Sequence, residues 1–303
     1  MASGWWRGSA RAVRAVRAPG LGLGLRAARI PTTGSSGPRS RLHPRPSAGE
    51  GSGLSRLHTD QAAGAEGLDA DGHYGLYPSH IPTNFVQKML LAAGSSIMAI
   101  SNPYRHDMVA VLGETTGELA IRSMRDRMRN DPEGNQVLEE RPRIRMSTLD
   151  MNHLRDLPEG TFGREYIRFL DVNRVSPDTR MPVKFVDDEE LAYVMQRYRE
   201  VHDLMHTLLA MPTNMMGEVV VKWFEAVQTG MPMCILGAAF GPLRLSARNL
   251  QVSITDLIPW AVRSGSNAQF MMNFYYERRW EQSLESLREE IGILLPPEIE
   301  LQE

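Results

Sequence analysis

Residues 187–229 have the pattern of two helices joined by a short break, which leaves few ways to fold them. A long, mostly apolar stretch opens with two acidic residues, and acidic side chains favour the first turn of a helix. Pro212 ends this helix, and Thr213 or Asn214 can cap the next one, which is expected to end at Gly230. Helices joined by so short a connection pack antiparallel. The sequence therefore predicts a helical hairpin.

Polar side chains on this hairpin are spaced so that they can converge. His202 and His206 are four residues apart and share one face of the first helix, with Asp203 about 100° further round. Glu218 lies one turn into the second helix, where antiparallel packing places it opposite His206. The surrounding residues are apolar, and burying these polar groups without a partner would be costly. Imidazoles and carboxylates that converge in this way favour a site for a divalent metal.

These residues have two alternative interpretations, as structural histidines or as a zincin-type zinc site. A single histidine on a helix is ordinarily a hydrogen-bonded structural residue, but a pair at this spacing with nearby carboxylates favours a metal. The pattern also differs from that of zincin proteases, which carry a glutamate directly after the first histidine as general base. That position holds Asp203 here, which would ligate the metal or hold another ligand in place.

Basic residues are concentrated at the beginning of the chain. Residues 1–59 hold ten arginines, no lysine and one acidic residue, although the net charge of the whole chain is −2. Residues 1–30 combine arginines at helical spacing with alanine and valine, which is typical of a mitochondrial transit peptide. The alternative is a disordered arm for nucleic acid, but such arms usually contain lysine and lack an apolar face, so no nucleic-acid partner is expected. Residues 31–75, rich in glycine, serine and proline, are predicted to be a disordered spacer.

Residues 76–297 are predicted to form a single all-α domain, followed by a tail at 298–303. Alternating runs of β-branched residues are absent, and no apolar run is long and unbroken enough to cross a membrane. The first helix should begin after Pro82–Thr83 and end near Asn102. Its only charge is Lys88, so it is either buried or lies against a membrane. Further helices are expected at 118–130, 162–171, 254–264 and 267–291, with a turn at 131–134 and a loop-rich region at 140–185.

The single cysteine, Cys234, limits the metal chemistry that is available. One cysteine excludes disulfides within the chain and cysteine-ligated zinc or iron–sulfur sites, so a metal must use nitrogen and oxygen ligands. Its apolar neighbours predict a buried, unreactive thiol. The chain has 18 methionines, several beside the hairpin, which suit either ordinary core packing or a cavity for a flexible apolar ligand.

The segment HDLMH at 202–206 followed by Glu218 resembles the HDxxH(x11)E motif of the Coq-four family of mitochondrial ubiquinone (coenzyme Q) biosynthesis proteins. The likeness extends to NPYRHDMVAVLGETTG at 102–117 and MGEVVVKWFEAVQTGMPMCILGAAFGP at 216–242, and covers about residues 77–297. It implies a mostly helical protein on the matrix face of the inner mitochondrial membrane, peripherally bound. It also implies a complex with other ubiquinone biosynthesis proteins, and leaves open whether the chain forms a homo-oligomer.

The resemblance also implies a site and a reaction. The metal ligands carried over are His202, Asp203, His206 and Glu218, with His202 and His206 also expected to be catalytic. Zinc is the metal usually assigned, whereas oxidative chemistry would need iron, manganese or cobalt. The reaction is C1-decarboxylation of 4-hydroxy-3-methoxy-5-polyprenylbenzoate to 2-methoxy-6-polyprenylphenol, and an oxidative version with C1 hydroxylation has also been proposed for the family.

Two other functions compete with this enzyme. One is a non-catalytic scaffold that binds the lipid and organises the biosynthetic complex, with a structural metal that only holds the hairpin together. The other is a phosphohydrolase of the HD type, which needs a further histidine and aspartate on separate helices. A phosphohydrolase pocket should be ringed by lysine and arginine, whereas residues 204–221 hold no basic residue except His206.

Overall fold

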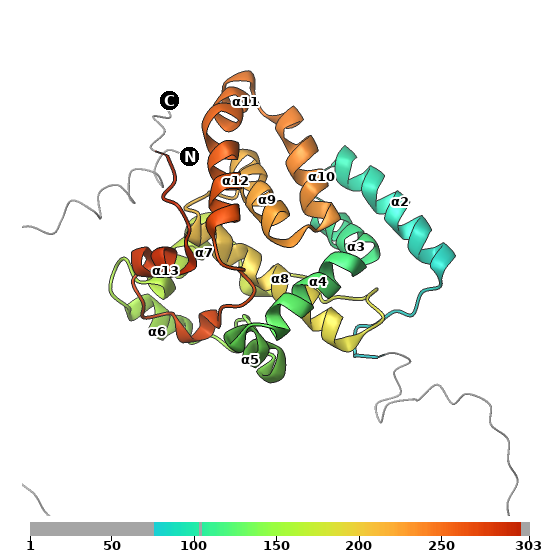
Figure 1. Cartoon of the computed structure of the whole chain (residues 1–303), viewed down its shortest axis with the longest axis horizontal. Coiled ribbons are helices and arrows are strands. Elements are labelled where there is room, and N and C mark those ends of the chain that lie inside the picture. The colour runs from blue at the N-terminus through green and yellow to red at the C-terminus, as the bar shows by residue number, and fades with distance from the viewer. Residues whose placement is uncertain (1–75, 103–104, 298–303) are drawn as a thin grey trace, which may run out of the picture.

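The computed structural model describes residues 76–102 and 105–297 (Figure 1). This part of the chain is all-α, as predicted, and its only β-type pairing is an isolated bridge between Thr161 and Ser283. The predicted transit peptide (1–30), spacer (31–75) and tail (298–303) lie outside the described residues. The α-helices are α2 (Phe85–Ser101), α3 (His106–Thr116), α4 (Glu118–Arg129), α5 (Pro132–Glu140), α6 (Met151–Asp156), α7 (Phe162–Asn173), α8 (Glu189–Leu208), α9 (Met215–Thr229), α10 (Pro232–Phe240), α11 (Ala247–Val252), α12 (Ile258–Asn267) and α13 (Leu284–Ile291).

Helix α8 runs through the centre of the fold, with α4, α7 and α9 packed against it (Figure 1). Every residue from Leu191 to Leu208 is buried, so this helix has no solvent-facing side. Its buried charges are each paired with a residue from another part of the chain, which offsets the cost of removing them from water. These pairs are Arg197 with Glu277, Arg199 with Glu114, Glu200 with Arg143, and Asp203 with Arg180.

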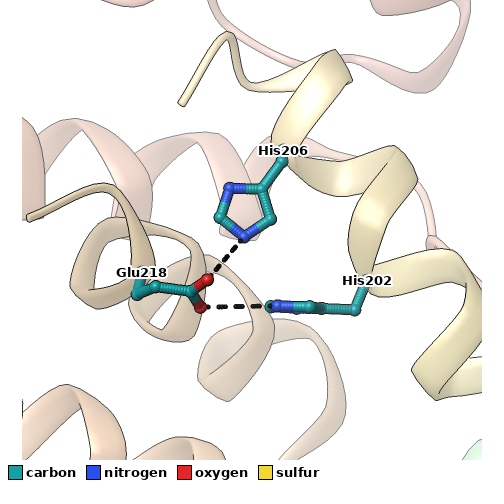
Figure 2. Close-up of side chains that lie close together, drawn as sticks. All are labelled: His202, His206 and Glu218. Carbon is teal, nitrogen blue, oxygen red and sulfur yellow. Dashed lines mark ion pairs between the residues drawn. The ribbon is translucent and has the colours of Figure 1, made fainter. Parts of the chain in front are cut away.

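The predicted hairpin is confirmed. Helix α8 begins after Asp188, whose carboxylate accepts a hydrogen bond from the Leu191 amide, and α9 begins after Asn214, which caps the Gly217 amide in the same way. Helix α9 ends at Gly230, where φ is 65°, a left-handed conformation that suits glycine. The hairpin places the histidines of α8 opposite a glutamate of α9 (Figure 2).

The turn of the hairpin requires a second glycine for a different reason. A Cβ at Gly217 would lie 1.9 Å from the carbonyl oxygen of Pro212. The first turn of α9 therefore packs directly on the backbone that ends α8, and only glycine allows this approach. This close contact fixes the position of Glu218, the next residue along the chain.

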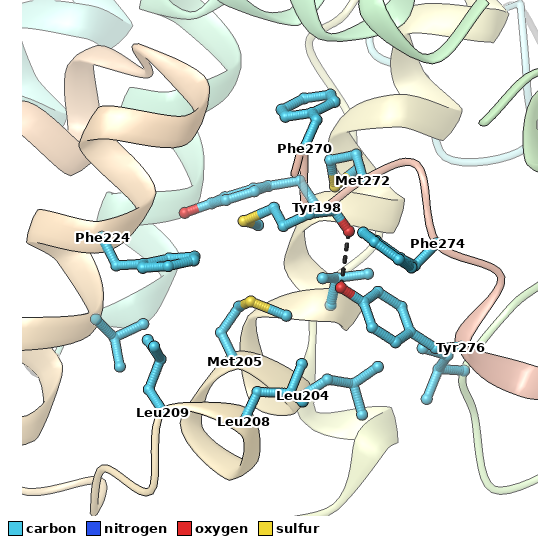
Figure 3. Packing of buried hydrophobic residues seen from close by; sticks show 14 of the residues in the cluster. Tyr198, Leu204, Met205, Leu208, Leu209, Phe224, Phe270, Met272, Phe274 and Tyr276 are labelled. Carbon is cyan, nitrogen blue, oxygen red and sulfur yellow. Dashed lines mark hydrogen bonds between the residues drawn. The ribbon is translucent and has the colours of Figure 1, made fainter. Parts of the chain in front are cut away.

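The hydrophobic core surrounds α8 and contains many aromatic and methionine side chains, some of which are drawn in Figure 3. Tyr198 and Met205 of α8 contribute to it, together with Phe224 of α9. Tyr276 also belongs to this core and donates a hydrogen bond of 2.8 Å from its hydroxyl to the Met271 carbonyl.

The prediction of one helix over 267–291 is wrong. Between residues 268 and 297, only α13 and the short 3₁₀ turn η4 (Tyr276–Arg278) are helical. The irregular segment is stabilised by side chains from elsewhere, because Gln228 accepts from the Met271 amide and Glu133 from the Tyr275 amide. These distant partners replace the helical hydrogen bonds and cannot be anticipated from local sequence.

Several helices begin where the sequence suggested turns or loops. Asp131 caps α5 by accepting from the Gly134 amide, and Pro132 occupies its first position, so the expected turn is a helix start. Helices α3, α6, α10 and α11 were not predicted. The expected helix at 254–264 is divided into a π-helical turn at Ser253–Leu257 (η3) and α12. The remaining short turns are η1 (Pro177–Thr179) and η2 (Gly241–Arg244).

Helix α2 occupies one edge of the molecule, where it packs mainly against α3 (Figure 1). Its predicted bounds are confirmed, but among its residues only Ser95 is buried. Of the two positions that its composition allowed, burial in the core is therefore wrong. Within the described residues, no helix combines the length and hydrophobicity needed to cross a membrane.

Candidate metal centre

The hairpin brings two imidazoles and one carboxylate together (Figure 2). His202 Nε2 lies 3.5 Å from one carboxylate oxygen of Glu218, and His206 Nε2 lies 3.4 Å from the other. One nitrogen or oxygen atom from each residue lies within 4.8 Å of the other two. His206 is fully buried and His202 nearly so, whereas the Glu218 side chain is 30% exposed. The described residues contain no second group of this kind.

The hydrogen bonds behind the two histidines leave their Nε2 atoms available. His202 Nδ1 lies 2.6 Å from Glu225 Oε1, and His206 Nδ1 lies 3.1 Å from the Met211 carbonyl oxygen. Both acceptors favour a proton on Nδ1 and therefore a lone pair on Nε2. His206 Nε2 is buried without a hydrogen-bond partner. Two imidazole lone pairs and a carboxylate facing one point fit a divalent metal ion.

Asp203 departs from the prediction. Its carboxylate is bound by the guanidinium of Arg180, with 3.2 Å between Arg180 Nε and Asp203 Oδ2, and it does not belong to the group formed by the other three residues. The position of Asp203 about 100° round the helix from His202 turns its side chain towards the 177–184 segment instead. The structure thus assembles three of the four expected ligands.

The histidines and carboxylates of the site stabilise each other's charged forms. Burial by itself raises the pKa of Glu218, but the adjacent His206 and His202 imidazoles hold it well below its usual value. Burial lowers the pKa of His202, but the Glu225 carboxylate outweighs this effect and raises it. Glu225 is itself ionised, because His202 and Lys222 lower its pKa against the effect of burial.

Glu225 is the centre of a buried network that sequence reasoning missed. Its Oε2 atom accepts hydrogen bonds of 2.6 Å from the Tyr198 hydroxyl and 2.6 Å from Lys222 Nζ. The Cys234 thiol lies beside it, with 3.0 Å between Cys234 Sγ and the Tyr198 oxygen. A signal was present in the spacing: Tyr198 precedes His202 by one turn, and Lys222 and Glu225 follow Glu218 at four and seven residues.

A cavity of about 180 Å³ opens beside the site. His202, Glu218 and Lys222 line one wall, and α3, α10 and the 179–181 segment complete it. Arg180 and Arg199 also line the cavity, so basic side chains from outside residues 204–221 surround it. Their absence within 204–221 therefore does not distinguish the candidate functions. Each of these cations is already paired with a carboxylate.

The pair His106–Asp107 at the start of α3 does not form a second metal site. Asp107 is bound by Arg105, with 2.7 Å between Arg105 Nη2 and Asp107 Oδ2, and this hydrogen bond lowers the pKa of Asp107 to about 2. His106 and Asp107 both line the cavity. They belong to the lining of the cavity and not to the metal group.

These features define a helical protein whose central hairpin groups two imidazoles and a carboxylate beside a cavity, which His202 and Glu218 line. Comparison with known proteins identifies the family of this chain. The family model described as coenzyme Q (ubiquinone) biosynthesis protein Coq4 matches residues 77–297. The chain belongs to this family, as the motif and its surroundings predicted.

Close relatives match over most of their length. The chain is 75% identical over 224 residues to the mitochondrial ubiquinone biosynthesis protein COQ4 homolog of Xenopus tropicalis, covering 74% of this chain and 80% of the relative. It is 69% identical over 228 residues to the Homo sapiens protein of the same name, covering 75% of this chain and 86% of the relative.

A solved structure shares the fold. A candidate ubiquinone biosynthesis protein from Nostoc punctiforme superposes with a TM-score of 0.55 at 21% identity. The match covers 70% of this chain and 99% of the Nostoc chain. This agreement concerns the arrangement of the helices.

Proposed function

We propose that the protein is a metal-dependent carboxy-lyase of mitochondrial ubiquinone biosynthesis, which removes the C1 carboxyl group from a 4-hydroxy-3-methoxy-5-polyprenylbenzoate. The observation that carries this proposal is the half-open site: of the three candidate ligands, His206 is buried, whereas His202 and Glu218 line a cavity that also holds basic side chains. A catalytic metal keeps a position free for substrate, whereas a structural metal is enclosed by protein ligands. The relatives named above support the pathway and the organelle.

His202, His206 and Glu218 would hold the metal. A divalent ion bound there supplies an electrophilic centre for the substrate carboxylate. Arg180 and Lys222 also line the cavity. Each is paired with a carboxylate of the protein, but their N–H groups would orient a benzoate with its carboxylate towards them. The choice among zinc, iron, manganese and cobalt depends on whether the reaction is oxidative.

The protein must also deliver a proton to C1. The 4-hydroxyl group of the substrate pushes electron density to C1, which takes up a proton to give a dienone, and loss of carbon dioxide restores the aromatic ring. The Nδ1 atoms of both histidines are already hydrogen-bonded, to Glu225 and to the Met211 carbonyl. Lys222 lines the cavity 3.2 Å from the Tyr198 hydroxyl, and we assign it as the group that supplies this proton.

Two rival functions are less well supported. A scaffold with a structural metal does not need an open cavity beside the ligands. A phosphohydrolase of the HD type needs more ligands than the three that the described residues bring together. The scaffold remains relevant as a second activity, because we also propose that the protein joins a complex of ubiquinone biosynthesis proteins at the matrix face of the inner membrane.

The test is turnover of a prenylated 4-hydroxy-3-methoxybenzoate by purified protein, in air and without oxygen, with the product identified by mass. We expect the parent to release the carboxyl group and His206→Ala to be inactive. Equal rates without oxygen establish simple decarboxylation, and a C1-hydroxylated product formed only in air establishes the oxidative version. A His206→Ala variant that turns over at the parent rate would refute the assignment.

A further inference from the structure

Helix α2 presents an apolar stripe that the rest of the described chain leaves uncovered. Leu90 and Ile97 are 68% and 66% exposed, far more than such side chains usually are in a folded core. Val86, Leu90, Ala93, Ile97 and Ile100 recur at spacings of four and three residues and therefore share one side of the helix.

The exposed surface continues onto α10 and the η2 turn. Ile235 and Phe240 of α10 are exposed, and so is Leu243 of η2. The guanidinium of Arg244 in η2 donates to the Ile100 carbonyl at the end of α2, which joins the two elements. Figure 1 shows α2 and α10 at the same side of the molecule. We call the exposed apolar residues of α2, α10 and η2 the α2–α10 face. A continuous apolar surface of this kind indicates a docking site.

The two segments that carry this face contain no acidic residue. Residues 76–106 and 226–255 contain no aspartate or glutamate, although the chain has 36 acidic residues. The basic residues in these two ranges are Lys88, Arg105, Arg244 and Arg248. Lys88 and Arg105 pair with Asp187 and Asp107 of neighbouring segments, whereas Arg244 and Arg248 are exposed beside the apolar side chains of η2 and α10. Exposed apolar side chains next to exposed arginines complement a lipid surface with anionic headgroups: the hydrocarbon region takes up the apolar side chains, and the headgroups attract the arginines.

We propose that the α2–α10 face docks the protein on an anionic lipid bilayer. Helix α2 then lies in the plane of the headgroups with its apolar stripe inserted, in keeping with its length and its single lysine. The composition of α2 allowed either burial in the core or a position against a membrane. Because the helix is exposed, we infer the second.

The face also lies beside the cavity, and this part of the inference rests on the proposed function. Helix α3 packs against both α2 and α10, and its residues Val109 and Ala110 line the cavity together with Met233 of α10. Docking through α2 and α10 therefore brings the cavity next to the bilayer. A substrate with a long apolar tail could reach the metal centre with that tail still in the lipid.

The test measures binding to lipid vesicles by co-sedimentation. The full chain is mixed with vesicles of phosphatidylcholine and phosphatidylglycerol, or of phosphatidylcholine alone. The variant carries Leu90→Glu and Ile97→Glu, which place charge in the apolar stripe. The matched control is Leu119→Glu on α4, because Leu119 is 84% exposed but lies outside the α2–α10 face.

We expect the parent and L119E to sediment with the anionic vesicles, and the double variant to bind on the order of tenfold more weakly. Binding should be weaker to phosphatidylcholine alone. Equal binding of the double variant and the parent would overturn the proposal. So would a dimeric parent that becomes monomeric on substitution without loss of lipid binding, because the face would then contact a second copy.

Turnover of a short-chain, water-soluble benzoate separates this inference from the proposed function. A double variant that keeps this activity but fails to bind vesicles supports docking independently of the chemistry. A parent that binds vesicles through this face but never decarboxylates would refute the lyase and leave the docking face standing.

Discussion

Glu225 Oε1 lies 2.6 Å from Nδ1 of His202, so a residue one helical turn beyond Lys222 determines which imidazole nitrogen faces Glu218. The same carboxylate binds Tyr198 and Lys222. A carboxylate behind a metal-binding histidine fixes the ring orientation and makes the ring a stronger ligand. Glu225 is in this sense a positioning residue for the metal centre.

Replacing Glu225 by glutamine should weaken metal binding about 10–100-fold, because the amide cannot hold the His202 ring as the carboxylate does. The measurement is metal affinity by competition with a chromogenic chelator. Glu200→Gln is the matched control, since Glu200 is an equally buried acid on α8 that pairs with Arg143 and not with a candidate ligand. Parent-like affinity in E225Q would contradict the positioning role.

Asp203→Asn distinguishes a ligand from a structural ion pair. The structure predicts that this variant keeps its metal but loses about 3 kcal/mol of unfolding free energy, because Arg180 loses its buried partner. Glu218→Gln should show the opposite pattern, with loss of metal and little loss of stability in the apo protein. Metal analysis and urea denaturation of both variants make the comparison. Loss of metal in D203N would restore Asp203 to the ligand set.

Gly217→Ala should destabilise the hairpin by about 2–3 kcal/mol, because its Cβ would overlap the Pro212 carbonyl and displace Glu218. Gly94→Ala on α2 is the control, since a Cβ there meets no atom within 4 Å and alanine favours helix by up to about 1 kcal/mol. Thermal denaturation measures both. Equal stabilities for the two variants would mean that the α8–α9 turn relaxes freely.

Burial raises the pKa of the Cys234 thiol to about 12. The folded protein should therefore resist alkylation by iodoacetamide near pH 9, whereas the urea-unfolded chain reacts rapidly. The raised pKa also makes the stability of the protein depend on pH. At pH values below the ordinary pKa of a thiol, Cys234 is protonated in both the folded and the unfolded protein. As the pH rises above that value, only the unfolded thiol ionises, so the free energy of unfolding falls. Rapid alkylation of the native protein would contradict this placement.

Elements with strong local signals were predictable from the sequence. Asp188, Asn214 and Gly230 act on backbone groups within a few residues, so the bounds of α8 and α9 could be inferred from the residues at their ends. Asp131 and Pro132 also act locally, but the same residues favour either a turn or a helix start. The prediction of a turn is wrong, because they begin α5.

The remaining features depend on contacts across long stretches of chain. Asp203 is paired with Arg180, which is 23 residues away, and nothing near Asp203 in the sequence reveals this partner. The segment after Asn267 is held by Gln228 and Glu133, so its helical composition did not decide its structure. Tertiary hydrogen bonds outweighed local propensity in both places.

The most direct test of the metal-dependent lyase is release of carbon dioxide as metal is titrated into chelator-treated protein. The account predicts one bound ion per chain, a rate that rises in proportion to bound metal, and neither binding nor release in Glu218→Gln. Full-rate release from metal-free protein, or a loaded site that releases none from bound substrate, would contradict it.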